Sequence, residues 1–256
     1  MRIIVFHAHI DADWFGKPLL PPARFLEAMD HHGVERACIF TLMGFYGDCR
    51  AHNERLAAHA RAHPERLMAF ATVDPKLGPA ALEDLQPCLD DPIFAGLKFH
   101  PWLQAFAPSM VQPTMNQLMQ RAAQKKWPVM FHDGTPPYST TFQIAALARD
   151  NPETVVVLGH AGLSDYVYAA GQLAAEIPNL YLCFCAPKAG ELPYLVRTAG
   201  AHKVLFGSDL GFGESRILEE RLDEVLMAGL DEATLDQVLY RNAARLLGLK
   251  QARVAT

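Results

Sequence analysis

Histidines stand near the ends of several short apolar segments of this 256-residue chain. His7 and His9 fall near the end of the first segment, His132 and His160 end two later ones, and Asp209 closes the last. Because alternate side chains of a strand point to the same side, His7 and His9 can face inward together. With His132 and Asp209 they form a ligand set of three nitrogens and one oxygen that suits Zn(II) and also Mn(II), Fe(II) or Co(II). An open position for water predicts a catalytic metal site rather than a structural one.

Each of these positions also has an ordinary structural interpretation. A single histidine in an apolar strand is usually a hydrogen-bonded core residue, and Ser-Asp at a strand end usually forms a turn or a helix cap. Metal-compatible groups at four separate strand ends, all directed toward the same rim, favour the metal site over that alternative.

The elements that must position these groups repeat eight times along the chain. Each repeat is a short apolar segment bounded by Gly, Pro or Asp, followed by a longer amphipathic segment. This α/β pattern predicts a (β/α)8 TIM barrel in a single domain over residues 1–256, with the active site at the carboxyl ends of the strands. An open doubly wound sheet is the competing fold, but no GxGxxG motif follows the first segment. The expected strands span residues 3–10, 35–42, 67–73, 95–101, 128–134, 154–162, 179–185 and 203–209.

The last amphipathic segment, residues 233–249, predicts one further helix that packs across the barrel.

The composition argues against several classes of function. The 23 basic residues against 28 acidic ones give a formal net charge of −5, which argues against nonspecific nucleic-acid binding. No apolar run reaches the roughly 20 residues that cross a bilayer, so we expect neither a membrane anchor nor a signal peptide. Five cysteines without CxxC spacing indicate reduced thiols and a cytoplasmic protein.

The ordered motifs resemble those of the metal-dependent amidohydrolase superfamily, specifically the amidohydrolase-2 branch, which includes aminocarboxymuconate-semialdehyde decarboxylase and dicarboxylate lactonases. FHAHI resembles the opening HxH of that family, GLKFHPWLQAF its fourth-strand signature, and PVMFHDGT, VVVLGHAG, VLFGSD and NAARLLGL its later blocks. The resemblance implies one divalent metal, Zn(II) in the first place, held by His7, His9, His132 and Asp209. It also implies that His160 is the catalytic acid and base, and that Asp209 can take a proton as well.

Two positions depart from the family pattern. The family often begins DxHxH, but Val5 occupies the place of the leading aspartate, so the partner of a metal ligand is missing or comes from elsewhere. The seventh strand often ends in Asp-x-Ser, whereas this chain has Cys183 and Cys185. Their spacing puts both thiols on one side of the strand. We expect buried, inert thiols, with thiols that face the site as the alternative.

Lys98 and His100 are two residues apart on the fourth expected strand. They are candidates for binding a substrate carboxylate or oxyanion, while the alternative is a rim lysine beside a core histidine. In binuclear members of the superfamily a carboxylated lysine on this strand bridges two metals, but the GLKFHP context resembles the mononuclear branch. The loops after strands one, two and four offer aromatic side chains for a substrate pocket or for the interface of a homodimer: Trp14, Phe45, Tyr46, Trp102 and Phe106.

The leading functional hypothesis is hydrolysis of an amide, lactone or ester in a small carboxylated metabolite by metal-activated water. The runner-up is nonoxidative decarboxylation with the same residues, since both reactions can use one site. A TatD-like nuclease is disfavoured for two reasons. Such a nuclease resembles a form in which a glutamate on the fourth strand bridges two metals, whereas this chain has Lys98 there, and the net charge of the chain is acidic. A noncatalytic binding barrel is disfavoured because the ligand set is complete.

Overall fold

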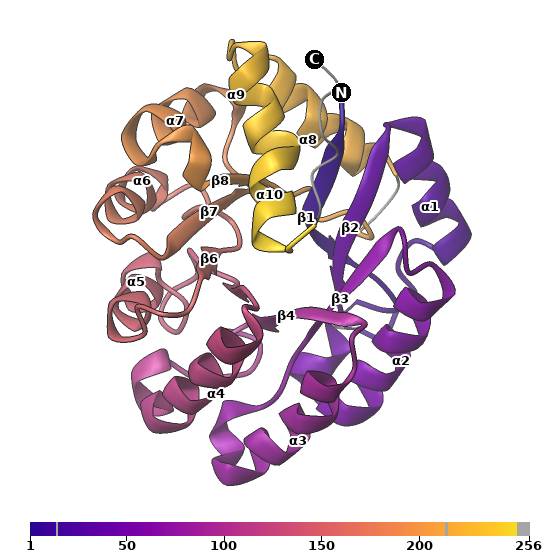
Figure 1. Cartoon of the computed structure of the whole chain (residues 1–256), viewed down its shortest axis with the longest axis vertical. Helices are drawn as coiled ribbons and strands as arrows, with labels where there is room; N and C mark the ends of the chain where they lie inside the picture. The colour runs from indigo at the N-terminus through magenta and orange to yellow at the C-terminus, as the bar shows by residue number, and fades with distance from the viewer. Residues whose placement is uncertain (14, 213–214, 250–256) are drawn as a thin grey trace.

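The structure, a computed structural model, describes residues 1–13, 15–212 and 215–249. Eight strands stand in the order of the sequence, each parallel to the next, and helices surround them (Figure 1). This arrangement confirms the predicted (β/α)8 barrel. The strands are β1 (Ile3–His9), β2 (Val34–Phe40), β3 (Leu67–Ala71), β4 (Phe94–Phe99), β5 (Val129–Phe131), β6 (Val156–Leu158), β7 (Leu180–Phe184) and β8 (Val204–Phe206).

The sheet joins its first and last strands through the segment that follows β8. The backbone N–H of His9 donates to the carbonyl of Leu210 at 2.7 Å, and the N–H groups of Ser208 and Asp209 reach the carbonyl of His7 at 3.2 and 3.1 Å. These bonds fix the end of β1 directly against the residues that follow β8. The predicted ligands His7, His9 and Asp209 are therefore held together by backbone hydrogen bonds.

The helices pack their apolar faces against the outside of the strands. In α5, for example, Thr140 and Gln143 form a capping box at the first turn, and Ile144 and Ala148 lie on the buried face. None of the described helices is long and apolar enough to cross a membrane. The main helices are α1 (Pro22–His31), α2 (Cys49–Ala62), α3 (Pro79–Asp90), α4 (Gln112–Lys125), α5 (Thr141–Asp150), α6 (Val167–Glu176), α7 (Leu192–Ala199) and α8 (Arg216–Leu226). Short 3-10 turns lie at η1 (Met43–Phe45), η2 (Pro75–Leu77), η3 (Pro108–Met110), η4 (Ala189–Glu191) and η5 (Ala201–Lys203).

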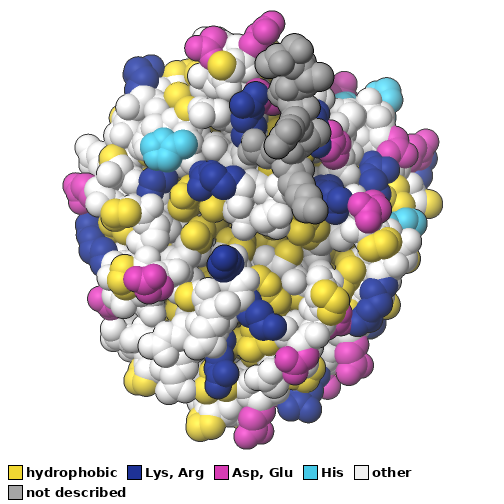
Figure 2. All heavy atoms as spheres, in the orientation of Figure 1, with side chains coloured by type: hydrophobic (Ala, Val, Ile, Leu, Met, Phe, Trp, Pro, Cys, Tyr) yellow, Lys and Arg dark blue, Asp and Glu magenta, His cyan; other side chains and the backbone are white. Residues whose placement is uncertain are grey.

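The segment after α8 packs across the barrel, as the sequence predicted, and it covers the amino-terminal end as an interrupted helix rather than a single one. It consists of α9 (Glu232–Asp236), a π-helical turn at Gln237–Arg241 and α10 (Asn242–Leu246). Tyr240 and Ala243 pack there against inward-facing strand residues, and Figure 1 shows α10 lying across this end. In Figure 2, the same face carries charged side chains of both signs around hydrophobic ones.

Two apolar layers pack against the strands, one outside the barrel and one inside it. The outer layer lies between the strands and the helices and includes alternate residues of every strand. The inner layer lies between the strands and the covering segment. Its buried strand residues are Ile4, Phe6, Cys38, Phe40, Phe70, Met130, Val157, Tyr181, Cys183 and Leu205, and Cys185 adjoins the layer directly after β7.

Candidate active site

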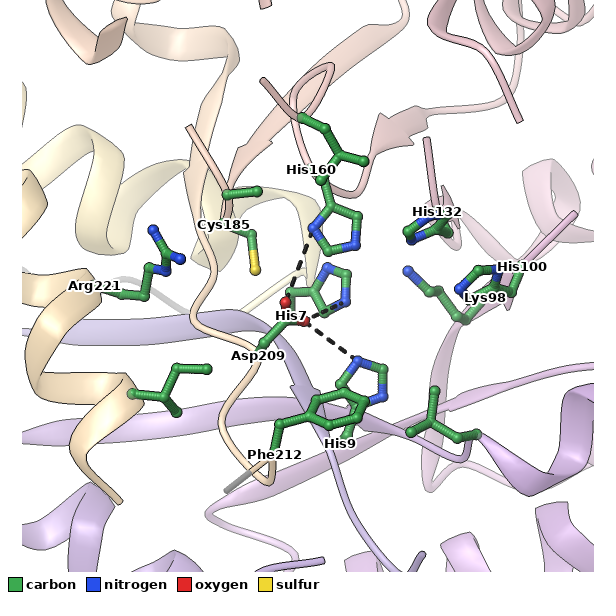
Figure 3. Close-up of a pocket in the computed structure, with 14 residues that line it drawn as sticks. His7, His9, Lys98, His100, His132, His160, Cys185, Asp209, Phe212 and Arg221 are labelled. Carbon is green, nitrogen blue, oxygen red and sulfur yellow. Dashed lines mark ion pairs between the residues drawn. The ribbon is translucent and has the colours of Figure 1, made fainter. Parts of the chain in front are cut away.

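Chemically active side chains from several strands meet in one pocket at the carboxyl ends of the strands. This inner pocket has a volume of about 370 Å³, and Figure 3 shows the side chains around it. Its walls also include the apolar residues Leu42, Phe212 and Ile217. The polar and sulfur-bearing residues that line it are His7, His9, Lys98, His100, His132, His160, Cys185, Asp209 and Arg221.

An irregularity in β1 aims its two histidines into the barrel. Phe6 belongs to the inner apolar layer, so strict alternation along β1 would turn His7 and His9 outward. The pairing of β1 with β2 shifts its register between Val5 and Ala8, and both histidines line the inner pocket. Such irregularities re-aim side chains next to active sites. The predicted same-side placement is therefore confirmed, through a feature that the HxH spacing does not reveal.

Three histidines converge on the carboxylate of Asp209. The Nε2 atoms of His7 and His9 lie 3.1 and 3.4 Å from its Oδ1 atom, and Nδ1 of His160 lies 4.0 Å from Oδ2. The Nδ1 atom of His7 is 2.9 Å from the carbonyl oxygen of Gly159. That carbonyl can only accept, so Nδ1 carries the proton of the neutral ring and Nε2 presents a lone pair. This backbone carbonyl supplies a partner for His7 in place of the family's leading aspartate.

Burial sets the charge states at this point. It lowers the pKa of His7 well below its ordinary value and lowers that of His160 to about 4, so both rings are neutral at pH 7. Burial raises the pKa of Asp209, but its contacts with His7, His160 and His9, including a hydrogen bond with His9, keep that pKa well below its ordinary value. A histidine lone pair and a carboxylate oxygen therefore face each other at 3.1 Å. Two acceptors this close fit a cation held between them.

The ligand atoms that lie closest together differ in part from the predicted set. His7, His160, Cys185 and Asp209 each offer one such atom, all within 4.8 Å of one another. Cys185 therefore faces the site, which the sequence analysis gave only as the alternative. Cys183 lies in the inner apolar layer, as expected for a buried thiol. The pKa of each thiol is raised by burial, so both are protonated without a metal.

His132 lines the same pocket but lies on its far side. Its ring stacks on that of His100 with centroids 3.8 Å apart, and its centroid is 4.6 Å from that of His160. Its Nε2 atom lies 2.7 Å from Oγ1 of Thr135. The backbone N–H of Leu103 donates to Nδ1 of His100, so the neutral His100 ring carries its proton on Nε2.

Asp133 ties the strand ends that carry two of these histidines. It is fully buried, and its carboxylate accepts from the backbone N–H groups of His160 and Gly162 at 2.8 Å and from the hydroxyl of Thr141 at 3.1 Å. Burial raises the pKa of Asp133 to about 6 against these three donors. Sequence reasoning passed over this residue, although its position directly after His132 was a usable signal.

Lys98 lies beneath the histidines, inside the barrel. It is 1% exposed, its Nζ atom lies 4.7 Å from the centre of the Phe40 ring, and burial lowers its pKa to about 8. The alternative of a rim lysine that extends to solvent is therefore wrong. A Cβ atom added at Gly159 would lie 3.1 Å from this Nζ and 3.3 Å from Cε1 of His7, so the missing side chain makes room for both groups.

A second, outer pocket adjoins the inner one through His100 and His132. It has a volume of about 540 Å³, and its other walls are Phe15, Tyr46, Trp102, Leu103 and Thr135. Tyr46 and Trp102 are 50% and 48% exposed, as expected for residues that contact a ligand or a partner chain. The prediction for Trp14 falls outside the described residues.

Two of the aromatic residues expected at this pocket lie elsewhere. Phe106 is fully buried and packs against Phe99 in the outer apolar layer. Phe45 packs in a small cluster with Leu19 and Leu42, and its ring centroid is 5.5 Å from that of His100. For these two residues the expectation was wrong, because the loops turn these side chains inward to cover apolar surface.

Unpartnered polar atoms concentrate at the inner pocket. Six buried side-chain polar atoms in the described part of the chain have no hydrogen-bond partner, and five of them belong to residues that line this pocket. Buried polar groups without partners are costly and rare in folded proteins. Their concentration indicates a site prepared for a cation and a polar ligand. The five residues are His9, Lys98, His160, Asp209 and Arg221.

Comparisons with known proteins find a matching family model and several solved structures with a similar fold. A family model described as Amidohydrolase matches residues 7–249. A search of the curated proteins finds no match. Among solved structures, a dihydroxybenzoic acid decarboxylase from Polaromonas sp. JS666, with bound manganese and the inhibitor 2-nitroresorcinol, superposes with a TM-score of 0.75 at 17% identity, covering 99% of both chains.

Two further solved structures are similar over nearly their whole length. The 5-carboxyvanillate decarboxylase from Sphingomonas paucimobilis has a TM-score of 0.75 at 15% identity, covering 97% of this chain and 99% of that one. The 4-oxalomesaconate hydratase from Rhodopseudomonas palustris has a TM-score of 0.69 at 16% identity, covering 96% of this chain and 95% of that one. At such identities the likeness concerns the fold.

Proposed function

The chain belongs to the amidohydrolase family, in the amidohydrolase-2 branch that its motifs resemble, and we propose that it is a metal-dependent hydrolase of a C–N or C–O bond in a small carboxylated metabolite. The observation that carries this proposal is the concentration of unpartnered polar atoms in the inner pocket. Histidine nitrogens converge there on one carboxylate, an arrangement that suits a divalent cation.

His7, His9 and Asp209 would hold one divalent metal, for which we propose Zn(II), and His132 would complete the set from the far side of the pocket. The atoms that lie closest together in the structure include those of His160 and Cys185 instead, so these two residues are the alternative ligands. Mn(II) is the alternative that the Polaromonas decarboxylase supports, since that structure contains manganese. When bound, such an ion supplies Lewis acidity to a substrate oxygen and to water.

His160 is placed to move the proton that hydrolysis requires. Its ring is neutral at pH 7, because its pKa is lowered to about 4, chiefly by burial, and its Nδ1 atom has no hydrogen-bond partner among the described residues. As the oxygen of water bonds to the carbonyl carbon, His160 accepts the proton of that water. It returns the proton to the leaving nitrogen or oxygen when the C–N or C–O bond breaks.

The remaining residues would bind and orient the substrate. His100 presents an Nε2–H donor to a substrate oxygen, and Lys98 offers a buried cation at the floor of the pocket. Tyr46 and Trp102 would contact the part of the substrate that extends into the outer pocket. The apolar walls exclude competing water, which strengthens these polar contacts.

Nonoxidative decarboxylation is the second candidate, and the decarboxylases among the similar structures favour it. The same residues would then move a proton to a carbon atom of the substrate instead of to a leaving nitrogen or oxygen. His160 would take up a proton from solvent and deliver it to the substrate carbon, and the C–C bond to the carboxylate would break to release CO2. Both candidates need the inner pocket and the same ligands.

The direct test is turnover by protein loaded with Zn(II) or Mn(II), on a panel of carboxylated lactones, amides and esters and of aromatic carboxylates. A new acid together with an alcohol or amine, without CO2, supports the hydrolase. Release of CO2 supports the decarboxylase instead. A metal-replete protein that turns over no member of the panel contradicts both candidates.

A further inference from the structure

Arg221 lines the inner pocket from the helix that follows β8. In α8 the residues Leu218, Leu222 and Val225 form the buried face. Ile217 and Arg221 stand one turn apart beside that face, and both line the pocket. The apolar packing of α8 therefore fixes the position from which Arg221 reaches the site.

The half-buried side chain of Arg221 has one buried donor without a partner. Its Nε atom is buried and has no hydrogen-bond partner among the described residues. On the same helix, Nε of Arg216 lies 2.8 Å from Oε1 of Glu220 in an exposed ion pair. A charged donor left without an acceptor is destabilising, and such a group is retained where a ligand supplies the acceptor.

Arg221 stands opposite the outer pocket. In Figure 3 it lies on the left, and Asp209 separates it from His100 and His132 on the right. His100 and His132 are the residues that the inner pocket shares with the outer one. A substrate whose acidic group lies against Arg221 therefore spans the histidines and points its other end at the aromatic walls.

We propose that Arg221 binds a carboxylate of the substrate that does not react, and so selects substrates that carry an acidic group besides the bond that is broken. A guanidinium offers two parallel N–H donors to a carboxylate, a geometry that a lysine or a neutral side chain does not provide. The proposal rests on the proposed function, since it takes the inner pocket as the place of reaction. For hydrolysis the substrate class is a carboxylated lactone, amide or ester, and for decarboxylation it is a dicarboxylate.

The test is equilibrium binding by calorimetry with two probes of the same shape. Isophthalate carries two carboxylates, and 3-carbamoylbenzoate has a carboxamide in place of one of them. We expect the metal-loaded protein to prefer isophthalate, and we expect Arg221→Gln and Arg221→Met to reduce that preference about tenfold or more, which corresponds to about 1.4 kcal/mol. Arg216→Gln, on the same helix but paired on the exposed surface, should leave it unchanged.

The outcomes separate this proposal from the function itself. A preference for isophthalate that persists unchanged in both Arg221 variants overturns the role of Arg221, whatever the turnover assays show. The same titration with metal-free protein keeps the test valid if no metal binds, because contact with the guanidinium does not require one. A ratio of two affinities is also insensitive to a general loss of folded protein, which circular dichroism measures independently.

Discussion

The same eight strands build both ends of this barrel, but apolar side chains pack together toward one end and polar side chains without partners gather at the other. Inside the barrel and toward its amino-terminal end, Phe70 and Leu205 belong with Tyr240 to one buried apolar layer. At the carboxyl end, the inner pocket contains five of the six unpartnered buried polar atoms in the described part of the chain. One end therefore resembles an ordinary core, while the other retains groups that only a ligand can satisfy.

In β1, adjacent residues belong to the apolar layer and to the pocket. Phe6 belongs to the apolar layer, and His7 lines the pocket. The register shift between Val5 and Ala8 turns both inward in succession. Phe6 therefore contributes to the stability of the fold, and its neighbour His7 to the site. Substitutions in the apolar layer should change stability, and substitutions in the pocket should change activity.

The largest effect should come from His160→Asn. We expect kcat to fall about 100- to 10,000-fold, because the variant lacks the group that moves the proton. The metal content should remain that of the wild type, because the predicted ligands are His7, His9, His132 and Asp209. Steady-state kinetics and elemental analysis of the same preparation check this. Cys185→Ser serves as the matched control for the cluster of closest ligand atoms. Metal lost from both variants would instead make His160 and Cys185 ligands.

A substitution in the inner apolar layer should lower stability instead. Phe70→Ala should lower the free energy of unfolding by about 3–5 kcal/mol, because it opens a cavity where the fully buried ring meets those of Phe6 and Phe40. The metal content of the folded protein should stay unchanged. Urea unfolding measures the loss, and Phe142→Ala, at a 54% exposed position, is the control. A Phe70→Ala protein that is as stable as the wild type would contradict the stabilising role of this apolar layer.

A smaller effect should appear when the metal-free protein is acidified. The pKa values of His7, His9 and His160 are lowered, mainly by burial, so the unfolded chain binds protons that the native site excludes. Stability should therefore fall as the pH decreases from about 6.5 toward 4. Asp133 acts in the opposite direction, since its pKa is raised to about 6. Urea unfolding at pH 7.5, 6 and 5 checks the sign, and stability that rises on acidification would show that Asp133 dominates.

The sequence predicted the barrel and placed His7, His9, His132, His160 and Asp209 at one rim, because strand alternation and parallel connections determine where strand ends meet. It did not predict that His160 rather than His132 is the third histidine beside Asp209. It did not reveal the register shift in β1, since periodicity carries no record of a local irregularity. It also missed Arg221. The spacing of Arg221 from Ile217 places both residues on one helix face, but only the packing of α8 shows that this face meets the pocket.

The loops were the least predictable part. Their aromatic residues have no fixed period, so Phe106 was expected at the pocket and lies in the core, while Tyr46 and Trp102 line the outer pocket. Cys185 had a usable signal, its position two residues after Cys183 at the end of β7. That spacing alone could not distinguish an inert thiol from one that faces the site.

The most direct measurement is the metal content of freshly purified protein beside His7→Ala and Asp209→Asn. We expect about one equivalent of a divalent metal in the wild type and almost none in either folded variant. Two equivalents in the wild type would indicate a bridging, carboxylated Lys98 instead. A wild-type protein that binds no metal under any supplementation, or variants that retain it fully, would contradict the central claim.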